Sequence, residues 1–301
     1  MKLKPFTYSL ATLLTGSLLG SCWHEDLSRC WKGDVVLSVT AECFATPPDG
    51  PSEADFGSRI GNLQYYLFDA DGKLTARGNA DGTSFSGDHY DLVFPTLPFG
   101  DYTLALTANT DGSVRQADAW NTLTLESPET SGTDYFTSLY NFRLDCECGY
   151  ADFVKLYRAK GIVEVRLEEL PSSITRARVD IGGVSAFCLP DTTYQGSMAV
   201  WGETPVTATD SEEAVTLSLD AFPTPADNFS EVTLTLYMTG SEGTEIVASR
   251  RTLTDRLQVV RNQLTGIRAD FNHSITVQPD IQIVLNPDWD GVNGDTDIDI
   301  D

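Results

Sequence analysis

Hydrophobic and polar residues alternate along most of the chain, in short runs that end at turn residues. Between residues 232 and 238, for example, Val, Leu, Leu and Met alternate with Thr, Thr and Tyr. This period-two pattern predicts a strand with one buried face. Helical periodicity is scarce and predicts one short helix, near 131–139 or 150–157. The pattern as a whole predicts an all-β protein.

Residues 108–138 are polar and rich in Gly, Ser and Thr, and they predict a long loop. The predicted strands form two groups, because the segment 140–144 closes the first group and the rhythm restarts with an apolar run at 154–167. The first group lies at 34–41, 62–68, 90–94, 102–106 and 140–144, and the second at 177–181, 196–200, 215–219, 232–238, 245–253, 258–260, 263–271 and 281–285. We place the boundary near Gly149. The predicted organisation is an N-terminal sandwich at 34–149, a C-terminal sandwich at 150–285 and a solvated acidic tail at 286–301.

The turns between the strands refine the fold class. Asp69-Ala70-Asp71-Gly72 predicts a hairpin turn, because Asp bonds the backbone that follows it and Gly tolerates a positive φ. Further along, Leu97-Pro98-Phe99-Gly100-Asp101-Tyr102 is similar to the turn and strand of transthyretin-like sandwiches. We therefore predict two tandem transthyretin-like antiparallel β-sandwich domains.

The start of the chain has the layout of a lipoprotein export signal. Two lysines precede an apolar stretch at 6–19 that is too short, and too soon interrupted, for a membrane span. This stretch ends in Leu19-Gly20-Ser21-Cys22, which resembles the lipobox of bacterial lipoproteins. We predict a signal peptide at 1–21, lipidation of Cys22 and a linker at 22–33.

Two acidic residues, Glu25 and Asp26, follow closely on Cys22. An acidic cluster at this place looks like the surface-export signal of Bacteroidales lipoproteins. We therefore expect a protein held in the outer membrane by its acyl chains and facing the cell exterior.

The overall charge narrows the classes of partner. Asp and Glu total 44 against 20 Lys and Arg, so the formal net charge is -24. Such a surface repels phosphate backbones and excludes a nucleic-acid partner. The sequence contains no nucleophile elbow, zinc-protease helix or Walker loop. We expect a protein that is not an enzyme and that uses no cofactor.

The cysteines allow disulfides but no metal site. If Cys22 is lipidated, five candidates for disulfide bonds remain, and at least one of them is unpaired within the chain; they are Cys30, Cys43, Cys146, Cys148 and Cys188. Cys146 and Cys148, placed on a strand, would face opposite sides of the sheet. That geometry suits neither a mutual disulfide nor two ligands of one metal, and no zinc-like spacing occurs elsewhere.

Other candidate sites have simpler explanations. The three histidines, His24, His89 and His273, are expected at the surface or in turns. Two Asp-rich segments, 69–72 and 288–291, could suggest calcium, but neither extends into a full binding loop, and hairpin turns explain both. Among five tryptophans, Trp120 and Trp201 are the best candidates for exposed platforms that stack on sugars.

Several motifs, in order along the chain, resemble the Bacteroidales family of FimB-like fimbrial anchor and minor-subunit lipoproteins. They are the lipobox to Cys22, Glu25-Asp26-Leu27-Ser28-Arg29-Cys30, the strand and turn Tyr65–Gly72, the segment Leu97–Tyr102, and Val260-Arg261-Asn262-Gln263-Leu264-Thr265. The resemblance implies two sandwich domains that anchor or nucleate a fimbria. It also implies assembly with pilin subunits by strand exchange, in which backbone pairing gives affinity.

Alternatives remain open within and outside this family. Arg59 lies at the place where shaft subunits of this type are cut by Arg- or Lys-specific proteases, so a shaft or tip subunit is one alternative. Cleavage there would also separate an anchor from its lipid, and an uncut loop residue is the simpler expectation. The other alternative is an outer-membrane glycan-binding lipoprotein, which would present its Trp side chains on one exposed face.

Overall fold

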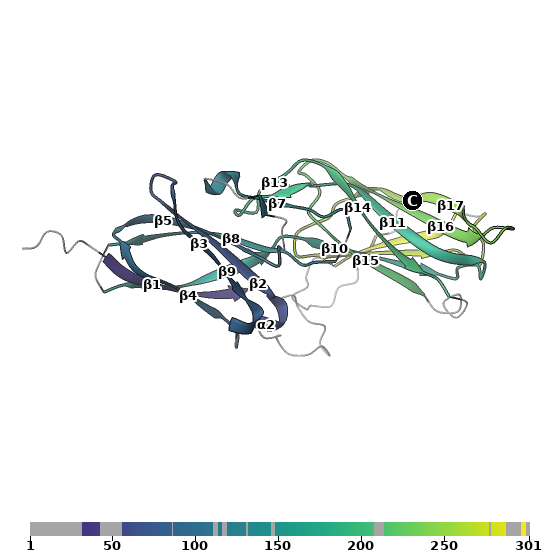
Figure 1. Cartoon of the computed structure of the whole chain (residues 1–301). Helices are drawn as coiled ribbons and strands as arrows, with labels where there is room; N and C mark the ends of the chain where they lie inside the picture. Colours follow the sequence, from purple (N-terminus) through teal and green to yellow (C-terminus); the bar gives the residue numbers. More distant parts are fainter. Residues whose placement is uncertain are drawn as a thin grey trace, which may run out of the picture.

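A computed structural model describes residues 32–42, 56–85, 87–110, 114–115, 119–130, 132–145, 148–207, 214–276, 278–286 and 296–298. Figure 1 shows two β-domains placed end to end, the first drawn in purple to teal and the second in teal to yellow. This confirms the predicted fold class of two tandem sandwiches. No helix in the described ranges is long and apolar enough to cross a membrane.

The N-terminal domain is built on seven strands. These are β1 (Lys32–Ala41), β2 (Asn62–Asp69), β3 (Leu74–Asp81), β4 (Tyr90–Pro98), β5 (Gly100–Ala108), β8 (Phe136–Leu144) and β9 (Tyr150–Arg158). They follow the order β3-β2-β5-β8-β9-β1-β4. The layers β3-β2-β5-β8 and β4-β1-β9 enclose one core, to which Leu37, Leu67 and Leu104 contribute fully buried side chains.

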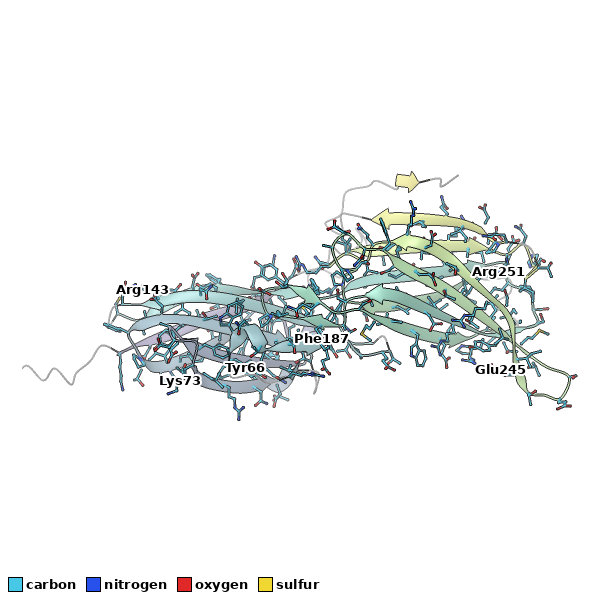
Figure 2. The ribbon with its side chains drawn as sticks, turned by 90° about the horizontal axis from the view of Figure 1, so that it is seen from above. Tyr66, Lys73, Arg143, Phe187, Glu245 and Arg251 are labelled. Carbon is cyan, nitrogen blue, oxygen red and sulfur yellow. The ribbon has the colours of Figure 1, made fainter. Side chains whose placement is uncertain are left out.

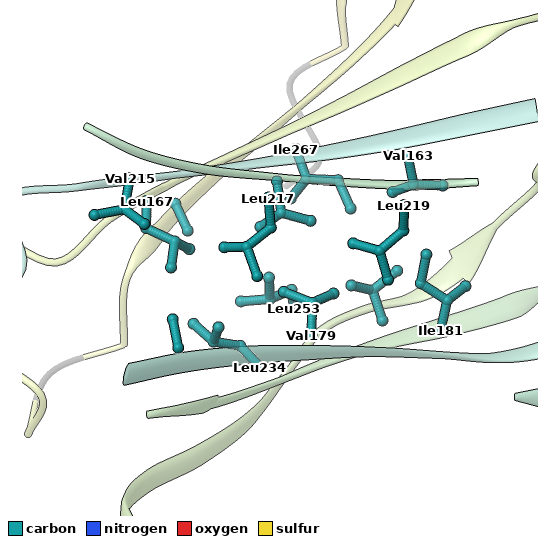
Figure 3. Close-up of a cluster of buried hydrophobic side chains, with 14 of the residues drawn as sticks. Val163, Leu167, Val179, Ile181, Val215, Leu217, Leu219, Leu234, Leu253 and Ile267 are labelled. Atoms are coloured by element: carbon teal, nitrogen blue, oxygen red, sulfur yellow. The ribbon is translucent and has the colours of Figure 1, made fainter. Parts of the chain in front are cut away.

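The C-terminal domain has two separate sheets. One has the order β14-β11-β16-β17, and its strands are β14 (Met198–Pro205), β11 (Ile174–Val184), β16 (Ser230–Thr239) and β17 (Glu245–Leu257). The other has the order β15-β10-β18-β19-β20, with β15 (Val215–Ala221), β10 (Gly161–Glu168), β18 (Leu264–Asp270), β19 (Asp280–Asn286) and β20 (Thr296–Ile298). Aliphatic side chains of the two sheets face one another in Figure 3; Val163, Leu217 and Ile267 lie opposite Val179, Leu234 and Leu253.

The two domains repeat one topology. The layer β3-β2-β5-β8 corresponds to β14-β11-β16-β17, and β4-β1-β9 corresponds to β15-β10-β18. In both domains the first strand pairs in parallel with the seventh, as β1 with β9 and β10 with β18. The sandwiches are therefore not purely antiparallel, because each chain half returns its seventh strand to the side of its first.

The structure corrects the predicted domain boundary. β9 follows Gly149 but pairs with β1 along seven residues, so it belongs to the N-terminal domain. The change of domain falls after Arg158. The local pattern suggested a restart at 150 because β9 and β10 follow each other with only two residues between them.

Three local predictions are also corrected. No described residue of 131–139 or 150–157 is helical, since these segments contribute to β8 and β9. Residues 258–260 are not a strand, although Val259 is buried as a strand residue would be. Within the predicted solvated tail, Thr296–Ile298 forms β20 and pairs with Ile283–Leu285 of β19.

The predicted polar loop at 108–138 contains structure that covers the N-terminal domain and reaches the second one. It includes β6 (Val114–Arg115), the 3-10 helix η2 (Trp120–Thr122) and β7 (Thr124–Glu126). β7 pairs with β12 (Phe187–Cys188) of the C-terminal domain, and β12 pairs with β13 (Tyr194–Gln195). The result is a small sheet, β13-β12-β7-β6, that contains strands of both domains.

Candidate functional site

The first strand lies in the middle of a sheet rather than at its edge. β1 pairs antiparallel with β4 and in parallel with β9. Val35, Leu37 and Val39 point into the core and are fully buried. Each such side chain stabilises the fold by about 2 kcal/mol relative to exposure. β1 is therefore a structural member of the N-terminal domain, and its loss would open a deep apolar groove.

A glycine closes the turn against the start of β1. Gly149 has a φ of +84°, and a Cβ placed on it would lie 2.8 Å from the carbonyl oxygen of Asp34. That distance is shorter than a carbon–oxygen contact allows. Gly149 thus permits the β8–β9 turn to approach the backbone of β1 closely.

Arg59 lies in a short helix and not in an open loop. Helix α2 spans Phe56–Arg59, and its Phe56 side chain is buried. The side-chain amide of Asn109 donates a hydrogen bond of 2.7 Å to the carbonyl oxygen of Arg59. The Arg59 guanidinium donates to the carbonyl of Glu42 at 3.5 Å. A protease needs an extended, accessible segment, and these contacts hold the bond after Arg59 in folded structure.

The cysteines divide into three sets. Cys22, Cys30, Cys43 and Cys146 lie outside the described residues. Cys148 is disulfide-bonded. Cys188 is free and buried, so it is removed from the candidates for a disulfide. Burial raises the pKa of the Cys188 thiol to about 12, which keeps it protonated and inert.

Within the described ranges, acidic residues that gather at a turn bond the backbone of that turn. Oδ1 of Asp69 accepts hydrogen bonds from the backbone N–H groups of Asp71, at 3.1 Å, and Lys73, at 2.9 Å. These are turn contacts, as the hairpin interpretation predicts. No group of three or more His, Cys, Asp or Glu in the described part of the chain could hold a metal ion. The second Asp-rich segment, 288–291, lies outside it.

The histidines and tryptophans are dispersed. Nδ1 of His89 lies 2.6 Å from the neighbouring Asp88, and Nε2 of His273 lies 3.8 Å from Glu169, both at the surface. Trp120 and Trp201 are half-buried and belong to different domains. The Arg178 guanidinium lies 4.2 Å from the centroid of the Trp201 ring. The two described tryptophans therefore do not form a shared platform.

Charged side chains that the sequence did not single out are buried at the domain junction. Lys160 is only 1% exposed; its ammonium donates to the carbonyl of Thr133 at 2.6 Å and lies 4.0 Å from the centroid of the Tyr135 ring. Arg158 pairs with Asp134 at 2.6 Å. A buried lysine needs such partners, because desolvation of an ammonium is costly.

Burial changes the pKa values of this group. It raises the pKa of Asp134 to about 6, although the charges of Arg158 and Lys160 oppose the rise. It lowers the pKa of Lys160 to about 8 and that of Arg158 to about 10. Each shift favours the neutral form, so desolvation outweighs the attraction between the opposite charges.

The junction is also an apolar interface. Leu125, Tyr135, Ala159, Cys188 and Phe222 form a buried cluster that draws on both domains. Its place between the domains is marked by Phe187 in Figure 2. Together with the small sheet and the charged group, this cluster joins the two sandwiches through backbone pairing, ion pairs and apolar burial.

Comparisons with known proteins agree with this architecture. The family model described as "Fimbrillin-A associated anchor proteins Mfa1 and Mfa2" matches residues 34–293. No curated protein matches the chain in sequence. Among solved structures, a proposed adhesin from Bacteroides thetaiotaomicron is similar, with 14% identity, a TM-score of 0.58, and coverage of 88% of this chain and 98% of that one.

Two further structures share the fold. A proposed polysaccharide-binding protein from Bacteroides thetaiotaomicron has 15% identity and a TM-score of 0.56, over 84% of this chain and 96% of that one. The fimbrial anchor protein Mfa2 from Porphyromonas gingivalis has 16% identity and a TM-score of 0.51, over 84% of this chain and 97% of that one. Identities this low show a common fold alone. The family match covers nearly the whole described region, and this chain belongs to the fimbrillin-A associated anchor protein family.

Proposed function

We propose that this protein is the lipid-anchored base of a fimbria, and that it joins the fimbrial shaft to the outer membrane without catalysing a reaction. The observation that carries the proposal is the match of residues 34–293 to a family of fimbrial anchor proteins. The sequence Leu19-Gly20-Ser21-Cys22 supplies the site for the lipid. The tandem sandwiches supply a body that can bear load between the membrane and the shaft.

The direction of β1 supports an arrangement in which the N-terminal domain lies near the membrane and the C-terminal domain points away from it. Its first residue, Lys32, pairs with Pro98, whereas Glu42, just after its last residue, contacts Arg261 at the domain junction. The strand thus begins at the end of the N-terminal domain away from the C-terminal domain, as Figure 1 shows. Nine residues lie between Cys22 and Lys32, and the ten residue steps span at most about 35 Å. A lipid on Cys22 would leave the C-terminal domain directed away from the membrane.

The C-terminal domain offers a surface for a fimbrial subunit. β17 is at the end of its sheet order, with β16 as its one neighbour among the described strands. Near its start, Ile246 and Val247 are 45% and 57% exposed. Unpaired backbone groups beside apolar side chains are what an added strand requires. In the proposed assembly, a strand of the first shaft subunit pairs with this edge.

The test is recovery of the assembly from outer membranes. The intact protein should copurify with pilin subunits in a complex that resists mild heating, as strand-paired complexes do. A photo-crosslinking residue at Val247 should capture a subunit, whereas one at Lys73 of the N-terminal domain should not. Cys22→Ala should release both the protein and its fimbriae from the membrane. Recovery of the protein without subunits contradicts the fimbrial role, and capture from Lys73 alone contradicts the edge.

A further inference from the structure

A cleft of about 550 Å³ opens on the outer face of the N-terminal domain, away from the core and from the domain junction. The neighbouring strands β5 and β8 form its floor, the β2–β3 turn forms one side, and Trp120 of η2 forms another. Figure 2 labels Lys73, which follows that turn, and Arg143 of the floor, both at the end of the domain away from Phe187. The volume of the cleft lies within the range of small-molecule sites.

The floor presents side chains rather than backbone groups. β5 is hydrogen-bonded to β2 on one side and to β8 on the other, so it has no free edge for an added strand. Four outward side chains line the cleft: Asp101 and Thr103 from β5, and Asn141 and Arg143 from β8. Recognition here must therefore use hydroxyl, amide, carboxylate and guanidinium groups.

These groups are arranged in two cross-strand pairs. Thr103 lies opposite Asn141 in the register and donates a hydrogen bond of 2.8 Å to its side-chain oxygen. The bond fixes the amide plane, and the N–H groups of Asn141 are left to serve as donors. Asp101 lies opposite Arg143, with 3.7 Å between their charged atoms. This loose ion pair leaves both side chains able to bond a ligand.

The indole of Trp120 is held in place from behind. It packs against a small buried cluster on the outside of the sheet, formed by Tyr66, Phe68, Ala105 and Leu123. The turn that carries it is closed by a hydrogen bond of 3.2 Å from the Leu123 N–H to the Trp120 carbonyl. Part of the ring is thus fixed in an apolar contact, while the rest lines the cleft. A pre-organised aromatic wall loses little entropy on binding.

We infer that this cleft binds a neutral saccharide unit, a function beyond the fimbrial role. A pyranose has an apolar C–H face that suits the indole, and hydroxyls that suit the carboxylate, amide and guanidinium of the floor. The carboxylates of Asp69 and Asp101 line the same space and disfavour a phosphate or another anion. The polar floor disfavours a purely apolar ligand, and no three-residue metal cluster occurs in the described part of the chain.

The cleft lies at the same end of the domain as the start of β1. Gly100 of β5 pairs with Leu144 of β8 there, and Lys32 pairs with Pro98 close by. The inference that the ligand is a saccharide depends on the cleft alone. Where that saccharide comes from depends on the proposed lipid anchor. An anchored protein would hold the cleft beside the sugars of its own cell surface. A free glycan from the surroundings is the other source of the same chemistry.

Affinity electrophoresis of the full chain carrying Cys22→Ala tests the inference. One gel contains polysaccharide purified from the surface of the bacterium that makes the protein, and another contains neutral plant and yeast polysaccharides. We expect retardation in one of the gels, and the gel that retards the protein identifies the source. Trp120→Ala and Asn141→Ala should each weaken the apparent affinity about tenfold, which corresponds to one lost stacking or hydrogen-bonding contact in a pre-organised site.

Trp201→Ala is the matched control, because it removes the other described tryptophan from the C-terminal domain and should leave retardation unchanged. Circular dichroism establishes that each variant is folded, and the exposed Asn141 position keeps the test valid if Trp120→Ala unfolds. Absence of retardation in every gel overturns the inference, and so does equal retardation of wild type and Asn141→Ala. Fimbrial recovery from membranes is measured separately, so a failed anchor role and a failed saccharide site give different results.

Discussion

The guanidinium of Arg261 donates a hydrogen bond of 2.8 Å to the carboxylate of Glu42, although 219 residues separate them in the chain. The same carboxylate oxygen accepts from the backbone N–H of Arg158 at 3.0 Å, and Arg261 also donates to the Arg158 carbonyl at 3.2 Å. Glu42 of the first domain and Arg261 of the second thus both bond the backbone of Arg158, the last residue of β9. The contact ties the end of the first strand to the segment before β18.

We expect Arg261→Met to lower the free energy of unfolding by about 2 kcal/mol, because it leaves the half-buried Glu42 carboxylate without its charged partner. Glu42→Gln should have a smaller effect, since the amide keeps an acceptor for both donors. Urea unfolding followed by fluorescence measures both. The control is Arg166→Ala, which should change stability by less than about 1 kcal/mol, because Arg166 is exposed and Glu168 keeps its second partner, Arg268. Additive effects of the two junction variants in a double-mutant cycle would contradict the coupling.

The raised pKa of Asp134 predicts a pH dependence with a defined sign. Its pKa rises from 3.8 to about 6 on folding, so between these values the folded protein binds a proton that the unfolded chain has released. The free energy of unfolding must then fall as the pH rises through this window. The variant Asp134→Asn has no carboxyl at this position and therefore lacks this pH dependence. The stability of wild type relative to the variant should therefore decrease from pH 4 to pH 6.5.

Urea titrations of the two proteins across this range provide the measurement. Exposed Asp255→Asn serves as the control for general loss of negative charge. A difference between wild type and Asp134→Asn that stays constant with pH would show that the carboxyl titrates normally at the junction.

Adding a side chain at Gly149 should lower stability more than adding one at Gly72, although both glycines have a positive φ. Gly149 and Gly72 both have positive φ, at +84° and +77°, but a Cβ on Gly72 would meet nothing within 4 Å. Gly72→Ala should cost about 1 kcal/mol from backbone strain alone. Gly149→Ala adds a clash with the Asp34 carbonyl and should cost about 2 kcal/mol more. Thermal unfolding compares the two, and equal losses would mean that the turn can move away from β1.

Arg59 should resist an arginine-specific protease in the folded protein. Cleavage requires the helical turn to open and the Asn109 bond to its carbonyl to break. Asn109→Ala should raise the rate of cleavage after Arg59 several-fold, as mass spectrometry of the fragments reports. Rapid cleavage of the wild type at this bond would instead favour a processed shaft or tip subunit over an anchor.

Local patterns in the sequence correctly predicted much of the fold. The alternation at 34–41 places Val35, Leu37 and Val39 on one face, and all three are buried. The Asp69–Gly72 turn is where the spacing puts it, because its Asp and Gly satisfy a hairpin by themselves. Such features depend on neighbours a few residues apart, which a single sequence contains.

Features that depend on distant partners were missed. β9 follows Gly149 directly, yet its parallel pairing with β1 assigns it to the first domain. Lys160 has no sequence signal of burial; only the approach of Thr133 and Tyr135 shows it. The cleft at Trp120 likewise needs β5 and β8 side by side and the 3-10 turn folded over them.

The sequence by itself determined the period of the strands and the turns that separate them, and it carries the lipobox-like segment before Cys22, because propensity and short motifs act within a few residues. The tertiary structure alone decided which strand closes each sandwich, which charges are buried at the junction and which side chains line the cleft. Those outcomes follow from the burial of apolar surface and the satisfaction of buried polar groups between segments far apart in the chain.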